Sequence, residues 1–420
     1  MSPIGMIGAR GRQVMQQVMA GVRVVEVAQF TFVPAAGAVL ADWGADVIKI
    51  EHPLRGDAQR GLIRVGGQDN TANINFLMEH SNRGKRSIGL DLAHPEGREL
   101  LYEMVRSADI FLTNLLPGTL ERLQIDVESI RRIQPRIIYA RGTAHGIRGP
   151  ERHKGGYDST DYWARSGSGM AGRGPTDMPA MQPGPAYGDS LGGMTIAGGI
   201  AAALFKRERT GESSVVDISL LGTGLWAMGA SLAGAMLAKG SGGGAMPMAG
   251  AAFINPLVGI YRTQEGGSLM LTMLQGHFYW ADTVEHLGRP ELATDPRFAT
   301  PEAFAENSAE ARQVLQEIFE TATLEEWRNR LAKMKGQWGP FQTTDQIPSD
   351  PQVIANDLIR EVDAGDGTSF RLVASPVQFD EQVPGLRKGP EHAQHTEEIL
   401  LELGLEWERI AKLKEAGAIS

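Results

Sequence analysis

One stretch near the N-terminus decides the fold class: residues 22–51 read VRVVEVAQFTFVPAAGAVLADWGADVIKIE. The branched apolar run Val22 to Val27 predicts a strand, and Pro34 to Trp43 predicts a helix that ends at Gly44. Ala45 to Glu51 predicts a second strand. Because parallel neighbouring strands need a crossover connection, usually a helix, this stretch predicts a β-α-β unit.

Further strands and helices are expected in alternation along the chain. The expected strands are 87–91, 109–113, 137–141 and 214–220. The expected helices are 95–108, with a proline at its start, and 190–209. Alternation of this kind predicts a parallel sheet with helices on both faces, which is a Rossmann-like α/β fold.

The rest of the chain has a different pattern. Residues 256–273 predict a hairpin and 277–323 a run of helices, which together indicate a second, smaller α+β domain. Two amphipathic helices are expected at 396–403 and 407–416. The Gly- and Pro-rich stretch 149–188 is too long and irregular for a simple connector, a length typical of loops that carry function.

The composition is that of a globular enzyme, with 420 residues, 42% hydrophobic, 22% charged and a formal net charge of −9. The negative charge disfavours nucleic-acid binding. The absence of cysteine excludes disulfides, thiolate nucleophiles and cysteine-ligated metals, and fits a reducing compartment. The apolar run Met194 to Phe205 is shorter than the about 20 residues of a membrane span, and no secretory signal is evident. We therefore expect a cytoplasmic protein without nucleic-acid or membrane partners.

Several common sites are disfavoured. The first β-α turn holds Pro34, Ala35 and Ala36 where a dinucleotide site needs spaced glycines, so an NAD site is not expected. The nine histidines lack metal-ligand spacing, and the pair His392 and His395 is read as surface histidines. We expect no metal and no permanently bound cofactor.

One acidic residue is singled out in the segment 188–193, GDSLGG, where Asp189 precedes a helix that we expect to begin at Ser190. The flanking glycines let a substrate approach the carboxylate, and free amides at the helix start can stabilise an oxyanion. The alternative is that Asp189 caps the helix, the commonest role of aspartate at this position. Close packing of the helix against another segment is predicted by four small residues: Gly192, Gly193, Gly198 and Gly199.

Eight segments spread over nearly the whole chain have an order and spacing that are hard to obtain by chance. They are 21–27, 40–51, 82–88, 108–109, 114–118, 156–158, 188–189 and 205–211. In these segments the chain resembles the class III coenzyme A transferases (CaiB/BaiF family), which include formyl-CoA, carnitine-CoA and 2-hydroxyacyl or aryl-lactate CoA transferases. The resemblance implies an enzyme that moves coenzyme A from an acyl-CoA thioester to a carboxylic acid.

The resemblance also implies roles for single residues. Asp189 matches the family's nucleophile, which passes through aspartyl anhydride and aspartyl-CoA thioester intermediates. The positions that match the coenzyme A site are His52, Leu90, Asn114, Leu115, Arg122, Tyr157 and Asp158. Of these, Arg122 is suited to phosphate because a guanidinium pairs with phosphate oxygens in a fork. His52 stands where formyl-CoA transferase has arginine, and Thr31 where it has glutamine, which disfavours formyl or oxalate chemistry.

The resemblance to the class III coenzyme A transferases also implies the domain arrangement. Residues 1–225 are expected to form the N-terminal part of the large domain, 226–335 a linker and the small domain, and 336–420 a segment that returns to the large domain. Two chains are expected to interlock as a homodimer with no stable folded monomer. The glycine-rich stretch 240–244 is either a lid or a flexible linker. An apolar acyl group is hinted at by three residues: Met246, Met248 and Phe253.

Two alternatives to the transferase remain open. The family also contains α-methylacyl-CoA racemases, which need a histidine and an aspartate as acid and base. The racemase histidine would fall at Tyr157, and tyrosine, with a reference pKa of about 10, is a poor base. Transferase is therefore favoured over racemase or epimerase. The other alternative is a non-catalytic CoA-binding protein in which Asp189 only caps a helix.

Overall fold

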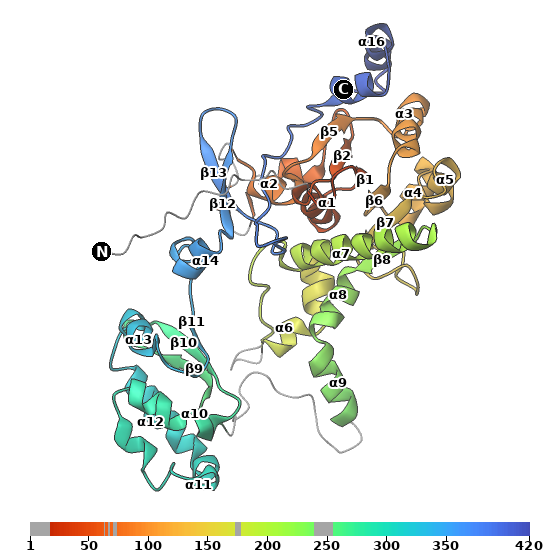
Figure 1. The fold of residues 1–420 in the computed structure, drawn as a ribbon. Helices are drawn as coiled ribbons and strands as arrows, with labels where there is room; N and C mark the ends of the chain where they lie inside the picture. The colour runs from red at the N-terminus through yellow and green to blue at the C-terminus, as the bar shows by residue number, and fades with distance from the viewer. Residues whose placement is uncertain (1–16, 63, 66–67, 70–73, 173–177, 239–254) are drawn as a thin grey trace. The chain divides into compact units, whose positions relative to one another are not determined.

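The computed structural model describes residues 17–62, 64–65, 68–69, 74–172, 178–238 and 255–420, which form two compact units (Figure 1). Unit 1 consists of the described residues of Met1–Met246 and Asp357–Ser420, and unit 2 of those of Pro247–Asn356. The chain therefore leaves unit 1 once and returns to it. The domain limits expected from the sequence, 1–225, 226–335 and 336–420, stay a prediction beside this division.

Six parallel strands form the main sheet of unit 1, in the order β5-β2-β1-β6-β7-β8. Their bounds are β1 Arg23–Val27, β2 Asp46–Glu51, β5 Arg86–Gly89, β6 Ile110–Thr113, β7 Ile138–Thr143 and β8 Val215–Ser219. Each strand expected in this region is present, with ends that differ by one or two residues. The predicted parallel α/β sheet is confirmed.

Helices cover both faces of this sheet because successive residues of a strand point to opposite sides. Val24 of β1 packs into one core and Val25 into the other. The first core includes α1 (Phe32–Asp42) and α7 (Tyr187–Thr210). The second includes α3 (Pro95–Arg106), α5 (Val127–Ile133), α15 (Thr396–Glu402) and α16 (Trp407–Glu415). Burial on both faces explains why the strands are apolar without alternation.

The smaller elements of unit 1 lie in its connections. They are α2 (Phe76–Asn82), α4 (Pro117–Leu123), α8 (Leu220–Ala227), α9 (Gly229–Ala238), the short helix η1 (Ala58–Gly61) and two hairpins, β3 (Arg64–Val65) with β4 (Gln68–Asp69) and β12 (Ile359–Asp363) with β13 (Ser369–Val373). No single helix among the described residues is long and apolar enough to cross a membrane; α8 and α9 reach that length and composition only together, across a 68° bend.

The start of α7 differs from the sequence-based expectation. The helix begins at Tyr187, three residues before the expected start, and its N-cap is Ala186, so the alternative that Asp189 caps the helix is wrong. Asp189 instead lies within the first turn. The preceding stretch 149–188, expected to be irregular, contains the π-helical segment η2 (Asp158–Arg165) and α6 (Ser168–Ala171).

The predicted close packing of α7 is confirmed for three of its four small residues. A Cβ on Gly192 would lie 2.3 Å from the Phe32 ring, and one on Gly193 would lie 2.6 Å from the Ala35 Cβ, so α7 contacts α1 almost backbone to backbone. A Cβ on Gly199 would lie 2.9 Å from Val216 of β8. Nothing among the described residues lies within 4 Å of the corresponding position on Gly198.

Unit 2 combines a small antiparallel sheet with helices, as the predicted α+β pattern requires. The sheet has the order β11-β10-β9, with β9 Val258–Arg262, β10 Ser268–Thr272 and β11 Trp338–Pro340. Its helices are α10 (Gly276–His286), α11 (Pro301–Glu306), α12 (Ser308–Phe319), α13 (Leu324–Leu331) and α14 (Pro351–Ala355). The buried rings of Trp280, Phe298, Phe319 and Trp327 fill its core.

Candidate active site

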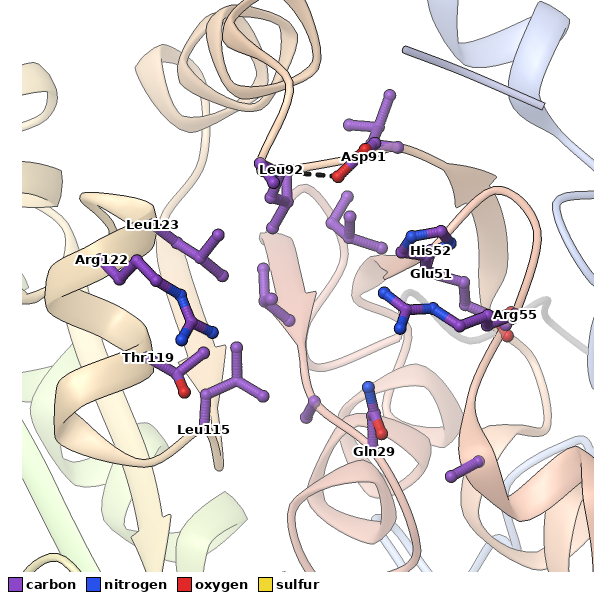
Figure 2. Close-up of a pocket in the computed structure, with 17 residues that line it drawn as sticks. Gln29, Glu51, His52, Arg55, Asp91, Leu92, Leu115, Thr119, Arg122 and Leu123 are labelled. Atoms are coloured by element: carbon purple, nitrogen blue, oxygen red, sulfur yellow. Dashed lines mark hydrogen bonds between the residues drawn. The ribbon is translucent and has the colours of Figure 1, made fainter. Parts of the chain in front are cut away.

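A cavity of about 470 Å³ opens where four adjacent strands, β5, β2, β1 and β6, have their carboxyl ends (Figure 2). Ligands of open α/β sheets bind at this edge. The polar lining comes from the end of β2, the loops after these strands and α4: Gln29, Glu51, His52, Arg55, Asp91, Thr119 and Arg122. Apolar residues, among them Leu90, Leu92, Leu115 and Leu123, line the rest.

Four of the residues expected to contact coenzyme A lie together in this cavity: His52, Leu90, Leu115 and Arg122. They come from three loops and one helix, so the fold alone brings them together. Gln29, Arg55, Asp91 and Thr119 also line the cavity and were missed by the sequence analysis. For Arg55 a signal existed, since it is a second basic side chain three residues after His52 in the same loop.

Two arginines that line this cavity have no ion-pair partner among the described residues. Figure 2 shows the guanidinium groups of Arg55 and Arg122 pointing into the cavity from opposite sides. Both residues are exposed, and neither guanidinium has a carboxylate within ion-pairing distance in the described part of the chain. Unpaired guanidinium groups on two sides of a cavity are suited to phosphate groups, which accept forked hydrogen bonds.

Asn114, also expected at the coenzyme A site, does not line the cavity but holds the loop after β1. Its Oδ1 accepts a hydrogen bond from the Gln29 N–H at 3.0 Å, and its Nδ2 donates to the Gln29 carbonyl at 2.7 Å. The side chain of Gln29 points into the cavity (Figure 2). Asn114 therefore sets the cavity's shape through the Gln29 backbone.

The next residue of this loop is held in a strained conformation. Phe30 has a φ of 63°, a left-handed value that is uncommon for a residue other than glycine. Its N–H donates to Oδ1 of Asp57 at 3.1 Å, and the other oxygen of Asp57 lies 2.8 Å from Nζ of Lys49. The side chains of Lys49 and Asp57 are both fully buried. A buried ion pair thus maintains the backbone of Phe30.

Asp189, the expected nucleophile, lies in the first turn of α7 with no hydrogen-bond or ion-pair partner for its carboxylate among the described residues. Burial raises the pKa of Asp189, and the negative charge of nearby Asp158 raises it further, to about 8. A carboxyl group without donors and with a raised pKa is a more basic oxygen nucleophile once ionised. The environment of Asp189 is therefore typical of a reactive group rather than of a structural one.

Asp158 is, by contrast, well supplied with donors. Its Oδ1 accepts from the Ser159 N–H at 2.7 Å, and its Oδ2 accepts from Gln182 Nε2 at 2.8 Å and from the Gly188 N–H at 3.1 Å. The last bond joins Asp158 to the residue directly before Asp189. Asp158 therefore lies next to the start of α7, where its charge contributes to the raised pKa of Asp189.

Tyr157 connects this region to the cavity. Its side chain is 60% exposed, and its ring meets that of Phe30 edge to face at 5.9 Å between centroids. A series of neighbouring residues and contacts thus leads from Gln29 in the cavity through Phe30, Tyr157 and Asp158 to Gly188, the residue before Asp189. The cavity and the carboxylate belong to one edge of the same sheet. The glycine-rich stretch 240–244 and the residues Met246, Met248 and Phe253 lie outside the described residues.

Comparison with known proteins assigns the chain to a family. The model of CoA-transferase family III matches residues 19–396. The (R)-2-hydroxy-4-methylpentanoate CoA-transferase of Clostridioides difficile is 28% identical over 404 residues, which are 95% of this chain and 98% of that relative. The cinnamoyl-CoA:phenyllactate CoA-transferase of Clostridium sporogenes is 31% identical over 397 residues, 94% of this chain and 95% of that relative.

A solved structure supports the same assignment. The crystal structure of a CaiB/BaiF family protein from Brucella suis superposes with a TM-score of 0.76 and 29% identity, and the alignment covers 93% of this chain and 100% of that one. The order of the matched segments, the parallel sheet and the similarity over nearly the full length agree. The chain belongs to CoA-transferase family III and is a class III CoA transferase.

Proposed function

We propose that this transferase moves coenzyme A from an acyl-CoA thioester to a carboxylic acid through covalent intermediates on Asp189. The observation that carries the proposal is the carboxyl group of Asp189, which lies in the first turn of α7 without a hydrogen-bond partner among the described residues and with a pKa raised to about 8. In its ionised form this group has an oxygen free to attack a thioester.

The proposed reaction has two symmetrical halves. The Asp189 carboxylate attacks the donor thioester carbonyl, the C–S bond breaks, and a mixed anhydride and the CoA thiolate result. The thiolate attacks the aspartyl carbonyl, the donor acid leaves, and an aspartyl-CoA thioester remains. The acceptor carboxylate then displaces the thiolate to form a second anhydride, and the thiolate attacks the acceptor's carbonyl, which gives the new acyl-CoA and regenerates Asp189. Each intermediate stays activated, so thioester energy is retained.

We place coenzyme A in the cavity at the strand ends. His52, Leu90, Leu115 and Arg122 line it, and Arg55 adds a second unpaired cation for the phosphates. Asn114 acts through the backbone of Gln29, while Tyr157 and Asp158 lie between the cavity and Asp189. This assignment gives each of the expected residues a place along one path, with the thioester end near α7.

We also propose that two chains form an interlocked homodimer in the cytoplasm. Large apolar side chains are exposed on α7, α8 and α9, where Phe205 is 68%, Trp226 87% and Leu237 81% exposed. An exposed apolar surface of this kind is typical of a protein interface. Size measurement on serial dilution tests the proposal, because a folded monomer at low concentration would contradict it.

The names of the relatives direct the choice of substrate. We propose that the donor or acceptor is a 2-hydroxy acid with a branched or aryl side chain, because two relatives act on such acids by name. The exposed ring of Tyr157, which contacts the partly buried ring of Phe30 beside the path to Asp189, offers apolar surface for such a side chain.

The experiment is intact-protein mass spectrometry after mixing the enzyme with a panel of aliphatic, aryl and 2-hydroxyacyl thioesters, followed by a hydroxylamine or borohydride trap and peptide mapping. An acyl or CoA adduct on the peptide that contains Asp189, absent from Asp189→Ala, supports the proposal and identifies the donor. Exchange of the α-hydrogen for deuterium without any acceptor acid, and without an adduct, would instead indicate a racemase. CoA binding without either reaction would indicate a non-catalytic protein.

A further inference from the structure

We infer that His80 is a positioning residue for Asp189, because its ring joins the first turn of α7 to α2 through the hydroxyl of Ser190. The inference rests on the proposed nucleophilic role of Asp189. His80 and Ser190 are 110 positions apart in the chain, so the contact exists only in the folded protein.

The geometry fixes which group donates. Nε2 of His80 lies 2.9 Å from Oγ of Ser190. The Ser190 hydroxyl donates its single proton to the carbonyl of Ala186 at 2.8 Å, so toward His80 it can only accept. The proton of the neutral imidazole is therefore on Nε2, and Nδ1 carries a lone pair. Two hydrogen bonds in series therefore connect His80 to Ser190 and Ser190 to Ala186.

These two hydrogen bonds constrain the helical turn that contains Asp189. Ala186 is the N-cap of α7 and has a φ of 57°, a left-handed value for which a residue with a Cβ is at a disadvantage of about 1 kcal/mol or more. Its side chain supplies no cap hydrogen bond. Because the carboxylate of Asp189 has no partner of its own in the described residues, its direction depends on this backbone turn. Ser190 is the next residue, and His80 holds it.

His80 is itself firmly anchored. The Nη1 of Arg83 donates to the carbonyl of His80 at 2.9 Å, and the Nη2 of Arg83 lies 2.8 Å from Oδ2 of Asp42 in α1. The side chains of Arg83 and Asp42 are almost completely buried. His80 lies in α2, and α1 packs tightly against α7 through Gly193. The helices α1, α2 and α7 therefore form one rigid support.

The same geometry argues against a Ser190–His80 nucleophile pair. No described residue contacts Nδ1 of His80 to orient the ring as a base, and the Ser190 proton is directed to Ala186. Burial and the charge of Arg83 lower the pKa of His80 to about 4, so the ring stays neutral and remains a constant donor. His80 therefore fits the role of a structural hydrogen-bond donor.

The test measures the rate at which a donor thioester labels Asp189 in a single turnover, together with the affinity for coenzyme A. His80→Ala is expected to slow labelling about 10-fold or more, since misplacement of a reacting group by about 1 Å can cost about 100-fold. The affinity for coenzyme A is expected to stay the same. His80→Gln keeps an N–H donor on a side chain of similar length and is expected to recover most of the rate.

Three further variants complete the design: Ser190→Ala, the double variant with His80→Ala, and a control. Ser190→Ala removes the acceptor, and if both residues act through one bond the double variant is no slower than the slower single variant. Ser190→Ala also decides the question if His80→Ala does not fold. The matched control is His286→Ala, whose ring contacts a carbonyl within its own helix α10 in unit 2 at 2.8 Å, and it is expected to label at the wild-type rate.

The outcomes separate the inference from the proposed function. Wild-type labelling of Asp189 in His80→Ala, or failure of His80→Gln to exceed His80→Ala, overturns the positioning role. If no thioester labels Asp189 in the wild-type enzyme, the proposed nucleophile is wrong, which is a different result and is seen before any variant is made.

Discussion

The side-chain amide of Asn114 holds the backbone of Gln29 on both of its polar groups, accepting from the N–H at 3.0 Å and donating to the carbonyl at 2.7 Å. The two residues follow neighbouring parallel strands, β6 and β1, which leave the sheet side by side. An amide is the one side-chain group that offers a donor and an acceptor in this fork geometry. The pair therefore fixes the loop from which the Gln29 side chain enters the cavity.

Asn114→Asp is expected to weaken coenzyme A binding about 10-fold. The carboxylate can still accept from the Gln29 N–H, but it loses the donor and opposes the Gln29 carbonyl, a cost of about 1–3 kcal/mol for the unpaired group. Calorimetric titration with coenzyme A measures the effect. Asn329→Asp, which replaces an exposed amide that donates to the Glu325 carbonyl in unit 2, is the control. Equal affinity for coenzyme A in the Asn114 and Asn329 variants would contradict this role of the Asn114 amide.

The arginines of the cavity are expected to bind different phosphates. Arg55→Ala and Arg122→Ala should each raise the Kd for coenzyme A about 10-fold, because hydrogen bonds to charged groups contribute about 1.5–3 kcal/mol. Dephospho-CoA, which lacks the 3′-phosphate, distinguishes the two: the arginine that contacts this phosphate loses its effect with the truncated ligand. Arg371→Ala, on the exposed hairpin β12–β13, is the control. If neither Ala variant changes the Kd, the cavity is not the coenzyme A site.

Much of the fold was predictable because the central strands β2, β1 and β6 are short, largely apolar runs whose residues are buried on both faces. Val24 and Val25 lie in different cores, and this double burial leaves a strong signal in the sequence. The start of α7 was not predictable. It depends on Ala186 taking a left-handed conformation and on the Gly188 N–H bonding to Asp158, a residue 30 positions earlier.

The candidate site was predictable only in part. His52, Leu90, Leu115 and Arg122 match positions of a known family, and parallel strands bring them to one edge. Arg55 was not among the matched positions, and its direction depends on how the loop after β2 turns, to which the bond from the Asp57 N–H to Glu51 at 2.9 Å contributes. The contact between His80 and Ser190 left no local signal, because it joins residues that are far apart in the chain.

The raised pKa of Asp189 predicts a pH dependence. The nucleophile must be ionised, so kcat/KM is expected to rise tenfold per pH unit below about 8 and to level off above it. Asp158→Asn removes the nearby charge and should move the midpoint to lower pH. It should not reach the ordinary value of 3.8, because burial, the larger cause, remains. A profile of the wild-type enzyme that is flat from pH 6 to 9 would contradict the assignment.

The raised pKa of Asp189 also predicts how the stability of the folded protein depends on pH. Between the ordinary pKa of 3.8 and the folded-state value of about 8, folded Asp189 keeps a proton that the unfolded chain has lost, so stability falls as the pH rises through this range. Asp189→Asn resembles the protonated form and cannot ionise. Its Tm is therefore expected to exceed that of the wild type by more at pH 9 than at pH 5, as thermal unfolding at both pH values can show. An equal Tm difference at both would contradict a partly buried carboxyl group that stays protonated in the folded protein.

The contact between α1 and α7 predicts opposite effects for two glycines of one helix. In Gly193→Ala the new Cβ would lie 2.6 Å from the Ala35 Cβ and 3.0 Å from the Ala36 backbone nitrogen, neither of which is the end of a flexible side chain. The helices must separate, so a loss of about 1–3 kcal/mol in the free energy of unfolding is expected. In Gly198→Ala the new Cβ meets nothing within 4 Å among the described residues, and the lower backbone entropy of the unfolded chain should give a gain of about 0.5–1 kcal/mol. Urea unfolding of the two variants and of the wild type measures both changes in the free energy of unfolding. If this free energy changes in the same direction in both variants, helix propensity, rather than the close approach of α1, determines the choice of glycine in α7.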